Sequence, residues 1–387
     1  MSDFGITLEE AVGIIFMTEN NCGEVIIMKK KIVLLAIFVC SLAALLAVSA
    51  FATESTVIGS GNCGKDGDNV TFTLYSDGLL KIGGKGEMGD YDYDGGPWFD
   101  NNEKIKKIVI AGGVTNIGNR AFMYSSNLTD IEIPSSVTSI GEYAFERCGM
   151  TGIEIPGSVK SIGKSAFFSC TKLESLVIPR GVTQIGSYAF DKCTGLKSLK
   201  IAGSVTSIGS DVFNSCRSLT SIEIMSGVTS IGGGMFYNCS SLESVKLPYG
   251  VTVIEMSAFR NCGKLKSIEI PSSVTSIEDG AFRDCGSLEN VYFSGQISDW
   301  QSITIGKNNE NLTNANINVV RYFNYGDIDD DGMITVSDTI LLAKYLAGRS
   351  TRFSHAVADV NCDGKLDIKD LIIIQQYLIG DVDKLGK

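Results

Sequence analysis

Two acidic segments near the C-terminus have the residue types and the spacing of calcium-binding loops. One runs from Asp327 to Asp338 and the other from Asp359 to Asp370. In each, side chains with oxygen atoms stand at positions 1, 3, 5 and 12 of a twelve-residue loop, and a glycine stands at position 6, where it permits a sharp turn. Calcium takes six to eight oxygen ligands, and this spacing makes alternate side chains converge on one ion. The chemistry that the pattern predicts is cation binding.

The two loops supply a full set of predicted ligands for two Ca²⁺ ions. For the first ion the set is Asp327, Asp329, Asp331, the carbonyl of Met333, a water held by Thr335, and Asp338. For the second ion it is Asp359, Asn361, Asp363, the carbonyl of Lys365, Asp367 through water, and Asp370. A solvated acidic turn is the alternative for one such loop. Two loops in the same register, each followed by an apolar helix, favour calcium.

The elements that must position these loops are amphipathic helices. The first loop runs into Leu-Leu-Ala-Lys-Tyr-Leu-Ala-Gly and the second into Ile-Ile-Ile-Gln-Gln-Tyr-Leu-Ile-Gly, while residues 316–325 before the first loop have an extended pattern. A helix is therefore expected only after each loop, which is half of an EF-hand. This duplicated arrangement, residues 325–387, resembles the dockerin module. The resemblance implies calcium-dependent folding and tight docking to a cohesin domain on a scaffoldin of a cellulosome-type complex.

The resemblance to dockerins also implies which residues meet the partner. In that family the cohesin is contacted by loop positions 10 and 11 and by helix positions 17 and 18. Here these positions hold Val336, Ser337, Ala343, Lys344, Ile368, Lys369, Gln375 and Gln376. The two halves carry different residues, so a symmetric, two-way docking does not follow from the resemblance. Val336 and Ile368 could anchor the partner or could instead pack within the module.

A second pattern, with a fixed period, fills the middle of the chain. A phenylalanine recurs every 23 residues, with one spacing of 22, at Phe122, Phe145, Phe167, Phe190, Phe213, Phe236, Phe259 and Phe282. In each period an L-x-x-L-x-L segment such as Leu173 to Ile178 places alternate apolar side chains on one side of a short strand. A repeat of this length cannot bury its own apolar side, so each coil must stack on the next.

The repeat predicts a leucine-rich repeat solenoid over residues 105–293, with about eight 23-residue coils of short parallel strands, turns and short helical segments. The small all-α calcium-binding domain follows it. The consensus sequence of the repeat, I-x-I-P-x-x-V-T-S-I-G-x-x-A-F-x-x-C, resembles that of the BspA-like leucine-rich repeats of secreted and surface bacterial proteins. The resemblance implies a curved right-handed solenoid that presents a surface for adhesion or binding, and it implies no chemistry.

Both ends of the solenoid need covers. Residues 53–104 lack the repeat but contain short strand patterns around the hairpin signal Asp77-Gly, and we expect them to form an N-terminal β cap. Residues 294–323, which include Trp300, are expected to form the C-terminal cap. The acidic, aromatic stretch of residues 90–99 could hold a sugar ring, or Trp98 and Phe99 could plug the end of the core.

Cysteines occupy one column of the repeat. Seven of the 11 fall there, at Cys148, Cys170, Cys193, Cys216, Cys239, Cys262 and Cys285. Neighbouring coils of a parallel solenoid lie about 4.8 Å apart, which is within the reach of a disulfide. An odd number of parallel side chains instead favours a ladder of small buried thiols.

The N-terminal region predicts export. From Met28 the chain has a basic start, an apolar core from Ile32 to Val48, and small residues at Ala50 and Ala52, so residues 28–52 are a predicted signal peptide cleaved after Ala52. Residues 1–27 are interpreted as an upstream extension, with Met28 as the initiator. A membrane anchor is the alternative, because the apolar run approaches the spanning minimum. With cleavage no membrane span is expected, and the predicted location is secreted and extracellular, on a cellulosome attached to the cell surface.

Composition and charge narrow the function. A formal net charge of -11 argues against a nucleic-acid partner, and the one histidine, His355, lies in the connector between the calcium loops, far in sequence from the repeat. We therefore expect no enzyme. The first hypothesis is a non-catalytic binding or adhesion module displayed on a scaffold through a cohesin, with an unknown surface protein or polysaccharide as the solenoid's ligand. The alternative is a structural or regulatory subunit, an inhibitor or spacer, within the complex.

Overall fold

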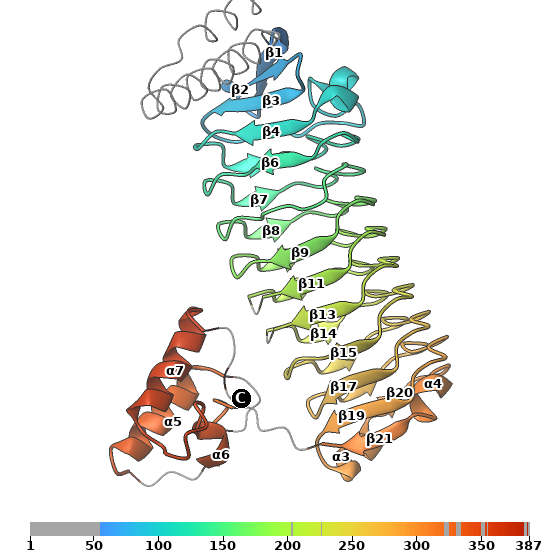
Figure 1. The fold of residues 1–387 in the computed structure, drawn as a ribbon, viewed down its shortest axis with the longest axis vertical. Helices are drawn as coiled ribbons and strands as arrows, with labels where there is room; N and C mark the ends of the chain where they lie inside the picture. Colours follow the sequence, from blue (N-terminus) through green and yellow to red (C-terminus); the bar gives the residue numbers. More distant parts are fainter. Residues whose placement is uncertain are drawn as a thin grey trace, which may run out of the picture. The chain divides into compact units, whose positions relative to one another are not determined.

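The computed structural model describes residues 55–202, 204–225, 227–320, 325–329, 334–349, 353, 355–382 and 385. The predicted extension (1–27) and signal peptide (28–52) lie outside these residues. The described chain forms a β-solenoid of about nine turns and, after it, a short helical region (Figure 1). Each of the two is described separately below.

The solenoid coils form two columns of parallel strands. The first column consists of β4 (Lys107–Ile110), β6 (Asp130–Glu132), β9 (Ser175–Ile178), β11 (Ser198–Ile201), β13 (Ser221–Ile224), β15 (Ser244–Lys246), β17 (Ser267–Pro271), β19 (Asn290–Ser294) and β21 (Asn316–Val319). The second consists of β5 (Asn116–Ile117), β7 (Ser139–Ile140), β8 (Ser161–Ile162), β10 (Gln184–Ile185), β12 (Ser207–Ile208), β14 (Ser230–Ile231), β16 (Val253–Ile254), β18 (Ser276–Ile277) and β20 (Thr304–Ile305). Equivalent residues of successive coils pair, for example Leu199 with Ile222.

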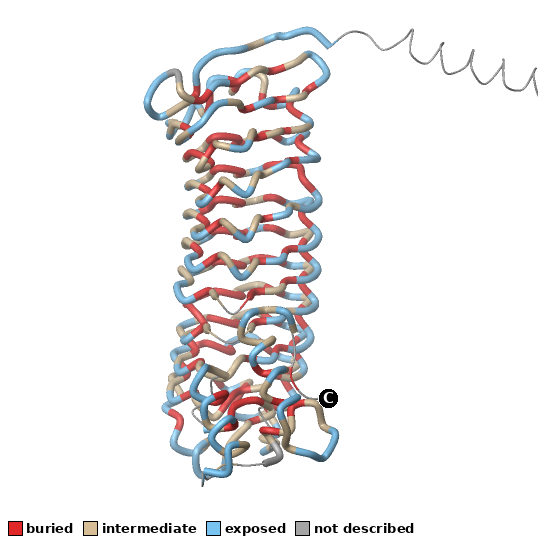
Figure 2. The backbone as a smooth tube through the Cα atoms, turned by 90° about the vertical axis from the view of Figure 1, so that its left-hand side faces the viewer, coloured by how far each residue is buried: buried red, intermediate tan, exposed pale blue. Residues whose placement is uncertain are grey.

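The strands show the predicted alternation. The two alternate apolar residues of a strand point into the core, and the residue between them points outwards. Leu176 and Ile178 of β9 are buried, and Val177 between them is exposed. Figure 2 shows buried residues recurring in coil after coil along the solenoid. The coil with the 22-residue spacing has no strand in the first column between β6 and β9. Met150 is buried there near the position of the leucine that begins the other coils, which suits its flexible side chain.

The third side of each coil is a turn ridge, which runs from the Gly after the second strand to the Cys (186–193 in one coil). The N–H of Cys193 donates to the carbonyl of Phe190 at 3.2 Å, so one turn closes, as the spacing of Phe and Cys predicts. The residue between them, Lys192, has a positive φ of 60°, and Tyr188 has one of 61°. The turn therefore cannot continue as a helix. Instead Tyr188, Phe190 and Lys192 donate N–H bonds to the next coil.

Phenylalanines and cysteines form two ladders inside the solenoid. Neighbouring Phe rings stack with centroids 5.0 to 5.7 Å apart from Phe122 to Phe282. The seven cysteines are free thiols, and each S–H donates to the carbonyl of the Phe one coil earlier, at 3.0 to 3.4 Å. The ladder of buried thiols is thus the arrangement present, and no disulfide joins these seven.

The first coil is covered by an antiparallel β-sheet. β1 (Val57–Gly64), β2 (Gly67–Tyr75) and β3 (Leu79–Gly84) pair in sequence order, and β3 continues into the parallel sheet through β4. The 3-10 helix η2 (Phe99–Lys104) follows. Trp98, only 1% exposed, stacks on Phe122 at 5.4 Å and donates its Nε1–H to the carbonyl of Ala121, so it plugs the core rather than facing a sugar.

At the other end, α3 (Ile297–Ser302), β20, α4 (Glu310–Thr313) and β21 follow the last full repeat. Trp300 of α3 packs edge-on against Phe293 at 5.5 Å. β20 and β21 pair with β18 and β19, so this segment adds a ninth turn to the eight coils expected from the sequence.

The helical region contains α5 (Val336–Leu346), α6 (His355–Ala358) and α7 (Ile368–Ile379). α5 and α7 pack against each other. Their shared core is built from the residues Ile328, Leu342, Ala358, Val360, Ile374 and Leu385.

Replacing Phe190 with Ala should remove about 3–5 kcal/mol of folding free energy, because the cavity would interrupt the ring stack on both sides. Urea unfolding followed by circular dichroism measures the loss. Phe168→Ala is the matched control, since Phe168 lies next to the ladder but is only half-buried. Equal losses in the two variants would contradict a stabilising role of the stack.

Candidate functional site

The first calcium-type loop is organised around Asp338. Its carboxylate accepts N–H bonds from Ile328 at 2.6 Å, Asp329 at 3.2 Å and Thr335 at 2.7 Å. Thr335 is the N-cap of α5, and its hydroxyl accepts the N–H of Ser337 at 3.1 Å, so the loop end and the helix start form a capping box. Position 12 therefore ties the start of the loop to the helix that follows it.

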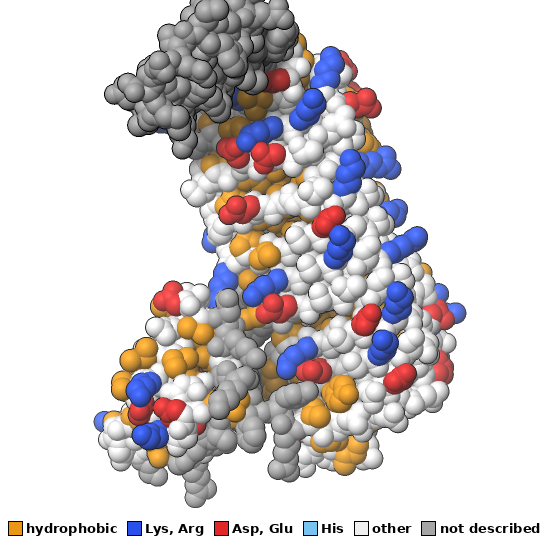
Figure 3. Space-filling model, viewed as in Figure 1, with side chains coloured by type: hydrophobic (Ala, Val, Ile, Leu, Met, Phe, Trp, Pro, Cys, Tyr) orange, Lys and Arg blue, Asp and Glu red, His pale blue; other side chains and the backbone are white. Residues whose placement is uncertain are grey.

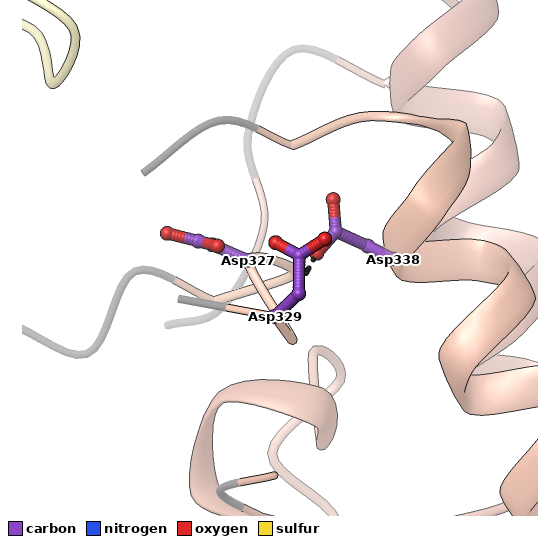
Figure 4. A group of neighbouring side chains, drawn as sticks. All are labelled: Asp327, Asp329 and Asp338. Carbon is purple, nitrogen blue, oxygen red and sulfur yellow. Dashed lines mark hydrogen bonds between the residues drawn. The ribbon is translucent and has the colours of Figure 1, made fainter. Parts of the chain in front are cut away.

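Three carboxylates converge in this loop. Oxygen atoms of Asp327, Asp329 and Asp338 all lie within 4.8 Å of one another (Figure 4). Asp338 is 0% exposed and Asp327 3% exposed, so two of the three negative groups are buried. Asp331 and Met333, predicted as further ligands, lie outside the described residues.

The electrostatics of the cluster fit a hard divalent cation. Burial raises the pKa of Asp338, and the nearby charge of Asp329 raises it further, while the three backbone N–H bonds lower it. Grouping buried carboxylates without a compensating charge is costly. A cation with all-oxygen coordination at this point removes that cost, and the donor set suits calcium. Such an ion would be held by these aspartates and would fix the loop against α5.

In the second loop the position-12 aspartate also accepts backbone N–H groups, but the side chains at positions 1 and 3 bond to the backbone of the loop. Asp370, fully buried at position 12, accepts N–H bonds from Asn361 at 3.3 Å and Asp367 at 3.0 Å. Asp359 accepts from the backbone of Asp363 and Gly364, and Asn361 also accepts from Asp363. Gly364 at position 6 has a φ of 81°, as the sharp turn requires. Of all the described residues, only those of the first loop form a group of acidic side chains close enough to share a metal ion.

The remaining predicted ligands take up helix-capping or exposed positions. Asp367 is the N-cap of α7 and accepts the N–H of Lys369 at 2.7 Å, as Thr335 does for α5. Asp363 accepts the N–H of Lys365 at 2.9 Å. The two position-9 residues, Thr335 and Asp367, are therefore equivalent in the two halves.

The residues expected to meet a cohesin lie on the outer faces of the two helices. On α5, Val336, Ser337, Ala343 and Lys344 are exposed. On α7, Ile368, Lys369 and Gln375 are exposed and Gln376 is partly exposed. Val336 is 63% exposed and Ile368 58% exposed, so neither packs within the module.

Two further exposed residues were missed by the sequence reasoning. Ile340 is 47% exposed and Ile372 45% exposed, and each follows Val336 or Ile368 by four residues, one helical turn along the same face. The two helices therefore present the same apolar pair. An isoleucine one turn after the predicted anchor, on the side away from Leu342 and Ile374 of the core, was the signal available in the sequence.

Family models match two parts of the chain. A BspA type leucine rich repeat region, in 6 copies, matches residues 96–220 and 206–325, and a dockerin type I domain matches residues 325–379. The chain belongs to the BspA-type leucine-rich repeat family. A dockerin type I domain follows the repeats. Both matched regions are of non-catalytic kinds, and no catalytic domain is among the matches. Dockerins bind Ca²⁺ and imply a cohesin partner.

Solved structures that resemble the chain are also leucine-rich repeat proteins. One is a leucine rich cell surface protein from Faecalibacterium prausnitzii A2-165, 25% identical, covering 66% of this chain and 98% of that chain, with a TM-score of 0.37. A second is from Eubacterium ventriosum ATCC 27560, 20% identical, covering 71% and 99%, with a TM-score of 0.30. A third, from T. pallidum, is 26% identical and covers 45% and 88%, with a TM-score of 0.37. No curated protein matches the chain.

No helix in the described part of the chain is both long and apolar enough to cross a membrane.

Proposed function

We propose that this protein is an exported, non-catalytic binding component of a cellulosome-type complex. Its dockerin docks onto a cohesin of a scaffoldin in a calcium-dependent manner, and its BspA-type solenoid is the recognition surface that the scaffold displays outside the cell. The dockerin match and the family of the repeats support this assignment. The proposal includes export through the signal peptide of residues 28–52.

The observation that carries the docking half is the pair of exposed apolar residues at the start of each dockerin helix. Val336 and Ile340 on α5, and Ile368 and Ile372 on α7, are exposed large aliphatic side chains at equivalent positions of the two helices; Ile379, at the end of α7, is exposed as well. Such groups form the energetic centre of protein interfaces when a partner removes them from water. The first residue of each pair is position 10 of a calcium-type loop and the second lies just after that loop, so the ion that orders the loop also fixes the start of the docking face.

A specific observation favours the alternative of a spacer or regulatory subunit. On the strand face, charges of successive coils neutralise one another, as in Lys200 with Glu223 at 3.5 Å and Lys246 with Glu269 at 3.1 Å. Figure 3 shows Lys or Arg beside Asp or Glu over much of the solenoid surface in view. Exposed pairs of this kind add little stability, and they leave the strand face with little net charge to attract a ligand. A binding module would then need a site elsewhere on the coils.

Calorimetric titration of the full chain with a panel of cohesins, in calcium and in chelator, tests the docking. We expect binding only with calcium. The double variant Val336→Asp/Ile368→Asp should weaken it by about 100-fold or more, because each aspartate places a charge in a desolvated interface. The single variants report which half is used.

Val177→Asp is the matched control, since Val177 is also an exposed apolar residue, 57% exposed, but lies on a solenoid strand. It should leave cohesin binding unchanged. If no cohesin binds in calcium, the docking assignment is lost. A pull-down with the full chain separates the two candidate functions. If the chain retains polysaccharides, it is a recognition module; if it retains co-assembled enzymes, it is a spacer or regulatory subunit.

A further inference from the structure

The turn ridge lacks a side chain at one position in two coils, those of Phe236 and Phe282, and only the coil of Phe236 has three glycines in a row there. In the position two residues before the ladder Phe, most coils carry a side chain, such as Tyr188 or Asp211. In the coil of Phe236 this position is Gly234, and it is preceded by Gly232 and Gly233. Gly234 has a φ of 61°, the same as that of Tyr188, so the backbone is unchanged and only the side chain is missing. The ridge therefore has a gap one coil wide.

This gap is the floor of a groove of about 440 Å³, open to solvent. Asp211 and Asn214 line it from the coil before, Tyr237 from the glycine coil itself, and Ser257 and Arg260 from the coil after. We call it the glycine groove. The groove is shallow, so a ligand can contact it with one face and belong to a longer chain that continues into solvent.

The side chains of the glycine groove are held in place by one another. Asn214 Nδ2 donates to Asp211 Oδ1 at 3.0 Å, and the Arg260 guanidinium lies over the Tyr237 ring, 5.6 Å from its centroid. Arg260 Nε is a buried atom for which the described residues provide no hydrogen-bond acceptor; its ion-pair partner, Asp284 Oδ2, is 3.7 Å away. Fixed polar groups of this kind are suited to recognise a ligand without reorganising.

The chemistry of the groove favours a polyhydroxylated, uncharged ligand. A carboxylate accepts hydrogen bonds, a guanidinium donates them, and an amide and hydroxyls do both, so neighbouring hydroxyls of a sugar ring can be satisfied as donors and as acceptors. Arg260 is the one cation at the groove, beside Asp211, its partner Asp284 and Glu255 on Gly233, so the local charge disfavours an acidic ligand. The only large exposed apolar residue at the groove is Met256, 57% exposed, which is too little for the aromatic or aliphatic centre of a protein interface.

We propose that the glycine groove binds one pyranose unit of a neutral glycan. The proposal rests on the proposed function of the solenoid as the recognition surface and gives that surface a location on the turn ridge, away from the self-neutralised strand face. The sugar ring lies over the Asp211 carboxylate, which covers Gly234, and contacts Arg260 on the other side of the groove. The rest of the glycan continues into solvent.

Affinity electrophoresis of the full chain tests the assignment, in gels that contain β-1,3-1,4-glucan, xyloglucan, xylan, galactomannan or, as an acidic comparison, homogalacturonan. We expect retardation by at least one neutral polysaccharide. Calorimetry with oligosaccharides of the retarding polysaccharide then gives the affinity. Gly234→Tyr should weaken it by tenfold or more, because the ring fills the groove and its Cβ meets the Asp211 carboxylate.

Gly280→Tyr is the matched control. Gly280 occupies the same ridge position two coils later with a φ of 63°, and the nearest atom to an added Cβ is Arg283 Cβ at 3.6 Å. Tyr143 and Tyr188 show that this position accepts tyrosine at φ values of 56° and 61°. The control should bind the glycan like the unmodified chain. Asp211→Ala, which removes the acceptor without filling the groove, should also weaken binding by about tenfold.

The outcomes separate the groove from the docking. Calcium-dependent cohesin binding should be the same in all these variants. Retardation by no neutral polysaccharide, equal losses in Gly234→Tyr and Gly280→Tyr, or glycan binding unaffected by Gly234→Tyr would each overturn the groove assignment while leaving docking intact. Binding of a protein that depends on Gly234, without any glycan, would overturn the ligand class. Glycan binding without any cohesin binding would support the proposal for the groove and contradict the proposed docking.

Discussion

Raising the pH above 9 should unfold the solenoid over a narrow range, with the midpoint near pH 10. Burial raises the pKa of all seven ladder thiols from the ordinary value of 9.0, to about 12 for Cys170, Cys239 and Cys285. In the unfolded chain the same thiols ionise at their ordinary pKa. The folded state thus keeps protons that the unfolded state has lost, and the stability contributed by these thiols is fully present below pH 9 and falls as the pH rises towards 12.

The size of the effect follows from the number of thiols. One thiol removes about 1.4 kcal/mol of stability for each pH unit above its unfolded pKa, so seven remove about 10 kcal/mol by pH 10. That equals the whole stability of a typical domain. Urea unfolding between pH 7 and 10.5, followed by circular dichroism with a phosphine reductant present, measures the slope.

Cys216→Ala isolates the contribution of a thiol. Removing this group should reduce the alkaline slope by about 1.4 kcal/mol per pH unit, although the cavity lowers stability at neutral pH. Val205→Ala also opens a cavity in the core but removes no titrating group, so its curve should run parallel to that of the unmodified chain. If the Cys216→Ala and Val205→Ala curves have the same slope, lysines and tyrosines rather than the ladder cause the alkaline unfolding.

The ladders were predictable because their cause is local in the sequence. A 23-residue period that repeats Phe and Cys places each of them above its counterpart, and the buried, free thiols are what an odd number of parallel side chains predicts. The number of solenoid turns was harder to predict from the sequence. The ninth turn is completed by β20 and β21, which pair with β18 and β19 although their sequences depart from the repeat.

The glycine groove could not be predicted from the sequence for a different reason. Gly232, Gly233 and Gly234 are ordinary turn residues along the chain, and their effect appears only when Asp211 and Ser257, 23 residues to either side, are placed next to Gly234.

In the dockerin, the twelve-residue spacing indicated the types of the calcium ligands. The spacing could not show that Asp338 also anchors the backbone of its loop, because the N–H groups that Asp338 accepts come from distant positions of the loop.

Asp338→Ala should remove the calcium site of the first loop and abolish docking to a cohesin. The carboxylate of Asp338 has two roles, since it completes the acidic cluster with Asp327 and Asp329 and accepts the N–H groups of Ile328, Asp329 and Thr335. Removing it leaves buried donors unsatisfied and the ion under-coordinated. Because Val336 begins the helix that this loop fixes, half of the docking face is lost with the ion.

Asp338→Asn separates the two roles in part, because its one amide oxygen can keep the N–H bonds of Ile328 and Asp329 that Oδ1 accepts, while the bond of Thr335 to Oδ2 and the charge that holds the ion are lost. It should preserve more helix than Asp338→Ala in circular dichroism and still bind one ion fewer by calcium titration of the full chain. Asp299→Ala is the matched control: Asp299 is the third residue of α3 and accepts the N–H of Gln296 at 2.8 Å in a capping box of the same kind, outside any calcium loop. That variant should bind as many calcium ions as the unmodified chain and keep full docking. An unchanged number of ions in Asp338→Ala would mean that position 12 is a structural anchor alone and that the cation is held by the other residues of the loop.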